Sequence, residues 1–223
     1  RGGAQRRQID GEEYSRISPS SVGLNRGPRV AVIYASGTIT SGKSGYDPVN
    51  GPVAGSETLV EYIRQARRDS LVRAIVLRID SPGGSATASD AIWRELMITR
   101  NERADRPLVV SMSDLAASGG YYIAMPAQVI VAQPSTLTGS IGIFGGKFVT
   151  GGVYEKLGAR IESTSIGRNA EINSPARRYN PEELKKLQEQ LQAFYDQFVE
   201  KVAESRHSTP EKIDALAQGR VWT

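Results

Sequence analysis

Two glycine-rich turns constrain the fold of this chain more than any other feature of its sequence. The first turn, residues 80–84, follows a nearly continuous apolar run at 72–79, and the second, residues 116–122, follows a strand-like run at 107–112. A helix-like pattern comes after or within each turn, at 86–100 and at 118–127. Continuous apolar strands suit a sheet that is covered on both faces, and a repeated strand–helix–strand order implies right-handed crossovers. The sequence therefore predicts an α/β fold with a parallel or mixed sheet.

The remaining patterns divide the chain into an arm and one domain. Residues 1–28 are rich in Gly, Arg, Ser and Pro and predict an extended arm or linker, and the domain spans residues 29–223. Further strands are expected at 29–35, 129–132 and 160–164, and further helices at 148–157 and after Ser56, whose hydroxyl suits an N-cap. Pro181 begins a long amphipathic helix whose apolar stripe indicates a core or subunit contact. The stripe consists of Leu184, Leu187, Leu191, Phe194, Phe198 and Val202.

Composition and charge exclude several functional classes. The net charge of +4 is spread along 223 residues without a basic stripe interleaved with aromatic residues, so nucleic acid is not an expected partner. The sequence has no run of about 18 apolar residues that could span a bilayer and no signal-peptide pattern at its start. Since no His/Asp/Glu cluster has the spacing of metal ligands, we expect neither a metal nor a cofactor. The chain begins without methionine, and we expect it to be a piece of a longer protein.

Ser118 is the candidate nucleophile because it precedes two glycines at a predicted helix start. An enzyme that attacks a carbonyl with serine needs an exposed hydroxyl and free backbone amides for the oxyanion, and glycine lets the substrate approach the backbone closely. Each turn alone predicts only a helix cap or a bend, whereas the two in order favour an enzyme. A Ser-His-Asp triad is not expected, because the single histidine, His207, stands before a helix-start pattern at 208–211 that explains its neighbourhood.

Four segments together resemble a known family of proteases. Residues 78–84, 116–122, 137–142 and 219–223 resemble the bacterial signal peptide peptidase A family, membrane-anchored serine proteases of the ClpP/crotonase-like superfamily. The resemblance covers about residues 30–223, and four motifs in the right order are specific where one would be weak. It implies a ClpP/crotonase-like fold, a Ser-Lys dyad and apolar peptide substrates such as signal peptide remnants. It also implies a homo-oligomer held at the membrane, on the periplasmic or extracytoplasmic side, by a segment absent from this chain.

The resemblance assigns roles to five residues. Ser118 matches the nucleophile, and Gly83, Gly84 and Gly119 match the backbone donors of the oxyanion hole. Ser140 matches the hydroxyl that hydrogen-bonds the general-base lysine. Apolar pockets beside Tyr121 and Ile141 are expected to select small or aliphatic side chains.

The base itself departs from the family pattern. The position expected for the lysine is Ala170, and no lysine occurs between Lys156 and Lys185. Either the chain is the C-terminal half of a long member, whose N-terminal half contributes the lysine, or it is a short member whose lysine was replaced or lost together with activity. Lys43 and Lys147 lie in glycine-rich loops away from the family position. Because serine at its ordinary pKa is a poor nucleophile, we expect the isolated chain to be nearly inert.

Two other functional classes remain open at this point. A catalytically silent half would serve only assembly of an oligomeric protease. A crotonase-like acyl-CoA enzyme would use the same backbone donors to hold a thioester enolate, although it has no need of Ser118.

Overall fold

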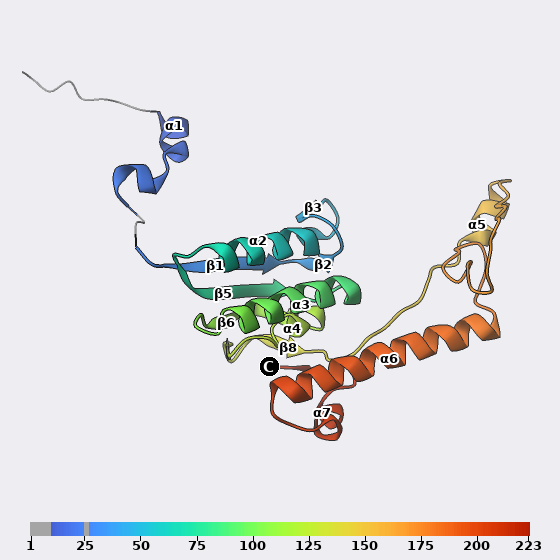
Figure 1. The fold of residues 1–223 in the computed structure, drawn as a ribbon. Helices are drawn as coiled ribbons and strands as arrows, with labels where there is room; N and C mark the ends of the chain where they lie inside the picture. Colours follow the sequence, from blue (N-terminus) through green and yellow to red (C-terminus); the bar gives the residue numbers. More distant parts are fainter. Residues whose placement is uncertain (1–9, 25–26) are drawn as a thin grey trace, which may run out of the picture.

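The computed structural model describes residues 10–24 and 27–223, and its centre is a six-stranded sheet (Figure 1). The order is β1-β5-β6-β8-β9, and β7 also pairs with β6. The strands are β1 (Arg29–Ser36), β5 (Val72–Ser81), β6 (Leu108–Ala117), β7 (Val129–Val131), β8 (Leu137–Gly139) and β9 (Val221–Trp222). All pairs are parallel except β8 with β9. The predicted α/β fold with a mostly parallel sheet is confirmed.

The first core forms where two helices pack on the middle of this sheet. Ile75, Leu77 and Ile79 of β5 are at most 2% exposed, and burying each such side chain contributes about 1.5–3 kcal/mol. They pack in one cluster with the apolar faces of α2 (Ser56–Arg68) and α3 (Ala86–Glu102), which lie along the strands (Figure 1). The N-cap of α2 is Gly55 rather than Ser56, and it makes no side-chain capping bond. The predicted Ser56 cap is therefore wrong.

A second, three-stranded sheet lies beside the first glycine turn. It has the order β2-β4-β3, from β2 (Thr38–Thr40), β4 (Gly51–Gly55) and β3 (Gly45–Asp47). Ile39 of β2 forms a parallel bridge with Gly84: its amide donates to the Gly83 carbonyl, and its own carbonyl accepts from the Ser85 amide, both at 2.8 Å. The turn is thereby fixed from outside the main sheet.

The long helix α6 (Pro181–Ser205) confirms the predicted helix and builds a second core. Its C-terminal half buries Phe198 and Val202 against Tyr122 and against α7 (Pro210–Leu216). Its N-terminal half extends away from the sheet (Figure 1), and Leu184 is 45% exposed. The predicted stripe is thus a core contact only in its second half. Its first turn has a capping box, and the side chain of Glu183 also pairs with Arg177 at 2.7 Å.

Other expected elements are shorter or missing. The predicted helix at 118–127 is only α4 (Gly119–Tyr122), and the one at 148–157 is α5 (Gly151–Lys156), which lies beyond the N-terminal end of α6 (Figure 1). Residues 160–164 form no strand and are exposed, because no neighbouring strand pairs with them in the described part of the chain.

The expected arm contains local structure in its described part. It holds the helix α1 (Gly11–Arg16) and the 3-10 turn η1 (Pro19–Val22), while residues 1–9 and 25–26 lie outside the described residues. Across residues 10–24 and 27–223, no helix combines the length and apolarity that crossing a bilayer requires.

Candidate active site

Ser118 stands at the end of β6 in a strained backbone conformation. Its φ is 51° and its ψ is −118°, a region that costs a non-glycine residue on the order of 1–3 kcal/mol and that recurs at functional sites. Two backbone hydrogen bonds hold it there: the Ser118 amide donates to the Gly139 carbonyl at 2.9 Å, and the Tyr122 amide donates to the Ser118 carbonyl at 2.8 Å. Its side chain makes no capping bond to α4. The half-buried hydroxyl is therefore not a helix cap, the role that a serine at this position would ordinarily have.

The two glycine turns touch each other at Ser118. A Cβ atom added to Gly83, whose φ is +98°, would lie 2.5 Å from the Gly119 amide nitrogen and 2.8 Å from the Cβ of Ser118. A Cβ added to Gly119 would lie 3.2 Å from the Gly84 amide nitrogen. Segments more than 30 residues apart in the sequence thus meet with no room for a side chain between them, and position 83 requires glycine on both steric and conformational grounds.

The three glycines differ in what their amides bind. The Gly83 amide donates to the Ser81 hydroxyl at 3.1 Å, and that buried hydroxyl donates to the Gly37 carbonyl at 2.7 Å. The amides of Gly84 and Gly119 have no hydrogen-bond acceptor among residues 10–24 and 27–223. Of the three expected donors, Gly84 and Gly119 therefore have amides available to a ligand, and the amide of Gly83 is engaged within the turn.

Ser140 reaches the same place from the end of β8, the strand that pairs with β6 on the side away from β5. Pairing of β8 with β9 brings the closing segment of the chain against it, and the Ser140 amide donates to the Arg220 carbonyl at 2.7 Å. The residue has a φ of 49°. Because the preceding Gly139 carbonyl accepts from Ser118, the Ser140 and Ser118 backbones are tied together by one hydrogen bond.

A cleft of about 770 Å³ joins all five predicted site residues. Its apolar wall is made by Tyr122, Ile143, Phe144 and Phe194 rather than by Tyr121 and Ile141, as the sequence had suggested. Ile141 is buried in the second core, and Tyr121 turns toward Arg206, whose Nε donates to its hydroxyl at 3.1 Å. The complete lining is Thr38, Pro82, Gly83, Gly84, Ser85, Ala86, Ser89, Ser118, Gly119, Tyr122, Ser140, Gly142, Ile143, Phe144, Phe194 and Gly219.

Sequence reasoning missed two parts of this cleft for different reasons. Phe194 carried a signal, because it belongs to the apolar stripe of α6, but a stripe does not indicate which of its members faces a cavity. Phe144 lies in a segment without regular structure, where no periodicity places a side chain.

The cleft contains no lysine, histidine or carboxylate among its lining residues in the described part of the chain. Lys147 is engaged elsewhere: its Nζ donates to the Ile172 carbonyl at 2.8 Å and lies 4.3 Å from the centre of the Tyr179 ring. Ala170 is exposed, in the segment between α5 and the start of α6. From Pro181 to Phe194, which lines the cleft, the helix rises about 20 Å at 1.5 Å per residue. The position at which the family resemblance predicts the lysine therefore lies on a segment beyond the end of α6 that is remote from the cleft (Figure 1).

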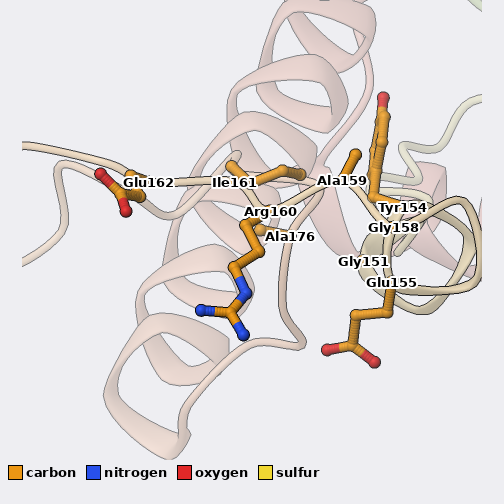
Figure 2. Close-up of a pocket in the computed structure, with 9 residues that line it drawn as sticks. All are labelled: Gly151, Tyr154, Glu155, Gly158, Ala159, Arg160, Ile161, Glu162 and Ala176. Atoms are coloured by element: carbon orange, nitrogen blue, oxygen red, sulfur yellow. The ribbon is translucent and has the colours of Figure 1, made fainter.

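A second hollow, of about 640 Å³, lies on this distant segment and contains none of the predicted site residues (Figure 2). It is lined by Gly151, Tyr154, Glu155, Gly158, Ala159, Arg160, Ile161, Glu162 and Ala176. Within the described ranges, no three His, Cys, Asp or Glu side chains gather as a metal site would require.

Comparison with known proteins identifies the family of the chain. Residues 100–223 match the model of Peptidase family S49. The chain is 43% identical over 217 residues to Protease 4 of Salmonella typhi, covering 97% of this chain and 33% of that protein. It is 41% identical over 219 residues to the chloroplastic serine protease SPPA of Arabidopsis thaliana, covering 96% and 32%. The chain thus spans about a third of the length of these relatives.

A solved structure confirms the ClpP-like fold. A point mutant of ClpP1 from Listeria monocytogenes superposes with a TM-score of 0.50 at 15% identity, covering 84% of this chain and 77% of that one. The family model and the two relatives named as proteases lead to the same assignment. The chain belongs to Peptidase family S49.

Proposed function

We propose that this chain contributes the nucleophile and the oxyanion hole of an endopeptidase that cleaves apolar peptides, and that a lysine from outside the chain serves as general base. One observation carries the proposal. The Ser118 hydroxyl is free of capping bonds at the point where two glycine turns bring the available amides of Gly84 and Gly119 together.

The proposed reaction begins with attack of Ser118 Oγ on the substrate carbonyl. The hydroxyl proton goes to the lysine, the C–O bond forms, and the carbonyl oxygen becomes an oxyanion that accepts hydrogen bonds from Gly84 and Gly119. The lysine then returns the proton to the leaving amine as the peptide bond breaks, and water clears the acyl-enzyme. Each such donor is typically worth about 10²- to 10³-fold in kcat, which is why the glycine geometry matters as much as the nucleophile.

The base is assigned outside the chain because the cleft wall has no side chain suited to the role in the described residues. Tyr122, which lines the cleft, has a pKa raised far above its ordinary value by burial and by its hydrogen bond to Asp90, so it stays a neutral phenol at neutral pH and cannot serve as the base. Ser140 would hydrogen-bond the incoming lysine, since it lines the cleft beside the nucleophile.

The cleft and the surface support proposals on substrate and assembly. The wall formed by Tyr122, Ile143 and Phe194 favours apolar segments such as signal peptide remnants. Phe144 and Phe148 are 97% and 92% exposed, and contact with further copies would remove such side chains from water. Membrane attachment through a segment outside this chain, on the extracytoplasmic side, rests on the family resemblance alone.

The experiment combines this chain with a lysine-bearing N-terminal half from a long family member. Turnover of an apolar fluorogenic peptide is measured with the chain alone and in the mixture, which we call the reconstituted enzyme. The mixture should exceed the chain alone by about 10²- to 10⁴-fold, the usual contribution of a general base. A serine-directed phosphonate should add its mass to the wild type and not to Ser118→Ala, while Ser70→Ala, an exposed serine in a turn, should behave as wild type.

Three outcomes would overturn the proposal. Cleavage that persists in Ser118→Ala would reject the nucleophile. Continued silence of every mixture would favour a scaffold role, and turnover of a CoA thioester in place of peptide would favour an acyl-CoA enzyme.

A further inference from the structure

A partly buried charged cluster lies directly behind the nucleophile turn and plays no part in the proposed chemistry. Lys201 of α6 donates from Nζ to Asp90 Oδ1 of α3 at 2.5 Å and to the Tyr122 hydroxyl at 2.6 Å. The Tyr122 hydroxyl in turn donates to the same Asp90 oxygen at 2.7 Å. Lys201 Nζ also lies 3.5 Å from the centre of the Trp93 ring. Three helices meet at one ammonium group.

Lys201 is not the missing base. Its side chain is only 13% exposed, it does not line the cleft, and its ammonium is neutralised by a carboxylate at 2.5 Å. Burial would raise the pKa of Asp90, but the hydrogen bonds from Lys201 and Tyr122 lower it below its ordinary value. The carboxylate therefore stays charged and holds Lys201 in an ion pair.

Tyr122 connects this cluster to the reacting groups. It is one helical turn after Ser118, whose carbonyl accepts from the Tyr122 amide, and the Ile123 amide donates to the Gly119 carbonyl at 3.1 Å. A helix of four residues is too short to be stable by itself, so α4 depends on tertiary contacts. The Tyr122 ring supplies them: it stacks on Phe194 at 5.8 Å and meets Phe198 edge-on at 4.8 Å.

We propose that Lys201 and Asp90 are positioning residues for the nucleophile, which fix Tyr122 and thereby the turn that carries Ser118 and the Gly119 amide. The packing of α6 against α3 and α4 then sets the geometry of the active site. This proposal rests on the proposed function for its catalytic consequence. Its structural part, the dependence of the 118–123 turn on α6, holds independently.

Three variants of the full chain test it. Lys201→Met removes the charge and keeps the packing volume, Lys201→Arg keeps the charge, and Tyr122→Phe keeps the ring but loses both hydroxyl contacts. In the reconstituted enzyme, Lys201→Met and Tyr122→Phe should lower kcat by about 10- to 100-fold, the scale of a misplacement of up to 1 Å, while KM changes far less. Lys201→Arg should recover most of the lost kcat.

Two controls separate positioning from general stability. Lys185→Met removes an exposed lysine from the same helix and should change nothing, and Ile213→Val weakens the second core through α7 and should lower the melting temperature without lowering kcat. The positioning role is rejected if folded Lys201→Met keeps the wild-type kcat. It is also rejected if Ile213→Val and Lys201→Met lower the melting temperature by the same amount and lower kcat by the same factor.

Hydrogen exchange on the chain alone distinguishes this failure from failure of the proposed function. The amides of Tyr122 and Ile123 should exchange faster in Lys201→Met than in wild type, relative to the amides of β5, whether or not the chain cleaves peptides. Unchanged protection of these two amides would overturn the inference even in an active enzyme.

Discussion

Gly83→Ala tests the contact between the two glycine turns most directly. The added methyl group would lie 2.5 Å from the Gly119 amide nitrogen, whereas an ordinary contact begins at 3.4 Å. One side of the contact must therefore move by roughly 0.9 Å, the difference of these two distances. Because a misplacement of about 1 Å costs on the order of 10²-fold, we expect kcat/KM of the reconstituted enzyme to fall about 10²-fold, which equals about 2.7 kcal/mol of transition-state stabilisation.

The matched control is Gly42→Ala. Gly42 has a φ of +89°, close to the +98° of Gly83, but a Cβ there meets nothing within 4 Å. Both variants should lose stability from the positive φ, on the order of 1–3 kcal/mol, measured by urea unfolding. Only Gly83→Ala should lose activity and phosphonate labelling. A folded Gly83→Ala enzyme with wild-type kcat/KM, or equal losses in both variants, would refute the convergence of the two turns on one reacting centre.

Three further predictions concern the long helix and the segment before it. The arginine and the backbone amide that bind Glu183 lower its pKa from 4.5 to about 2, so its contribution to stability is complete above pH 4.5 and is lost as the pH falls toward 2. The melting temperature of the wild type should therefore fall across this pH range. The fall should be smaller in Glu183→Gln and as large as in the wild type in the variant of its exposed neighbour, Glu182→Gln. Phe198→Ala should cost about 3–5 kcal/mol of unfolding free energy, because the side chain is 1% exposed, whereas Phe148→Ala, at 92% exposed, should change the monomer by less than about 0.5 kcal/mol. Ala170→Lys should give the chain peptidase activity only where copies assemble, with turnover rising faster than in proportion to chain concentration; activity strictly proportional to concentration in a dilute monomer would contradict the separation of residue 170 from the cleft.

The parts of the fold that could be predicted from sequence are those stabilised by local pattern or by the main core. The strand at 72–79 and the helix beginning at Pro181 carry periodicity over many residues, and the structure has both as β5 and α6. The glycines at 83 and 119 are expected to let a substrate approach the backbone closely, and in the structure their two turns lie so near each other that a Cβ added to Gly83 would be 2.5 Å from the Gly119 amide nitrogen. In these places the sequence pattern and tertiary packing require the same conformation.

The failures occur where tertiary context decides. Residues 160–164 have a strand-like composition, but strands need partners, and the described chain offers none there. The predicted helix at 118–127 stops after Tyr122, because the strained start at Ser118 and the anchored Tyr122 side chain fix a single turn. The Gly83 amide was expected to be free. The Ser81 hydroxyl that binds it is two residues away, but no sequence pattern reveals that this hydroxyl is buried and also donates to Gly37.

Under the proposed function, this chain provides the oxyanion donors and another segment provides the lysine, and this arrangement has a physical reason. Oxyanion donors are backbone amides, which can be held within tenths of an ångström only by the strand ends and glycine turns of one continuous core, and this chain supplies all of them from β5, β6 and the bridge to β2. A lysine reaches its target through four methylene groups, so it tolerates delivery from a separate segment. The Ser140 hydroxyl on the cleft wall would then hydrogen-bond the lysine ammonium or amine and hold this flexible side chain in one position beside Ser118. The oxyanion donors need a rigid core, and for that reason Gly83 cannot be substituted. The lysine needs only a flexible side chain that reaches the cleft, and for that reason the separation of Ala170 from Ser118 is compatible with catalysis.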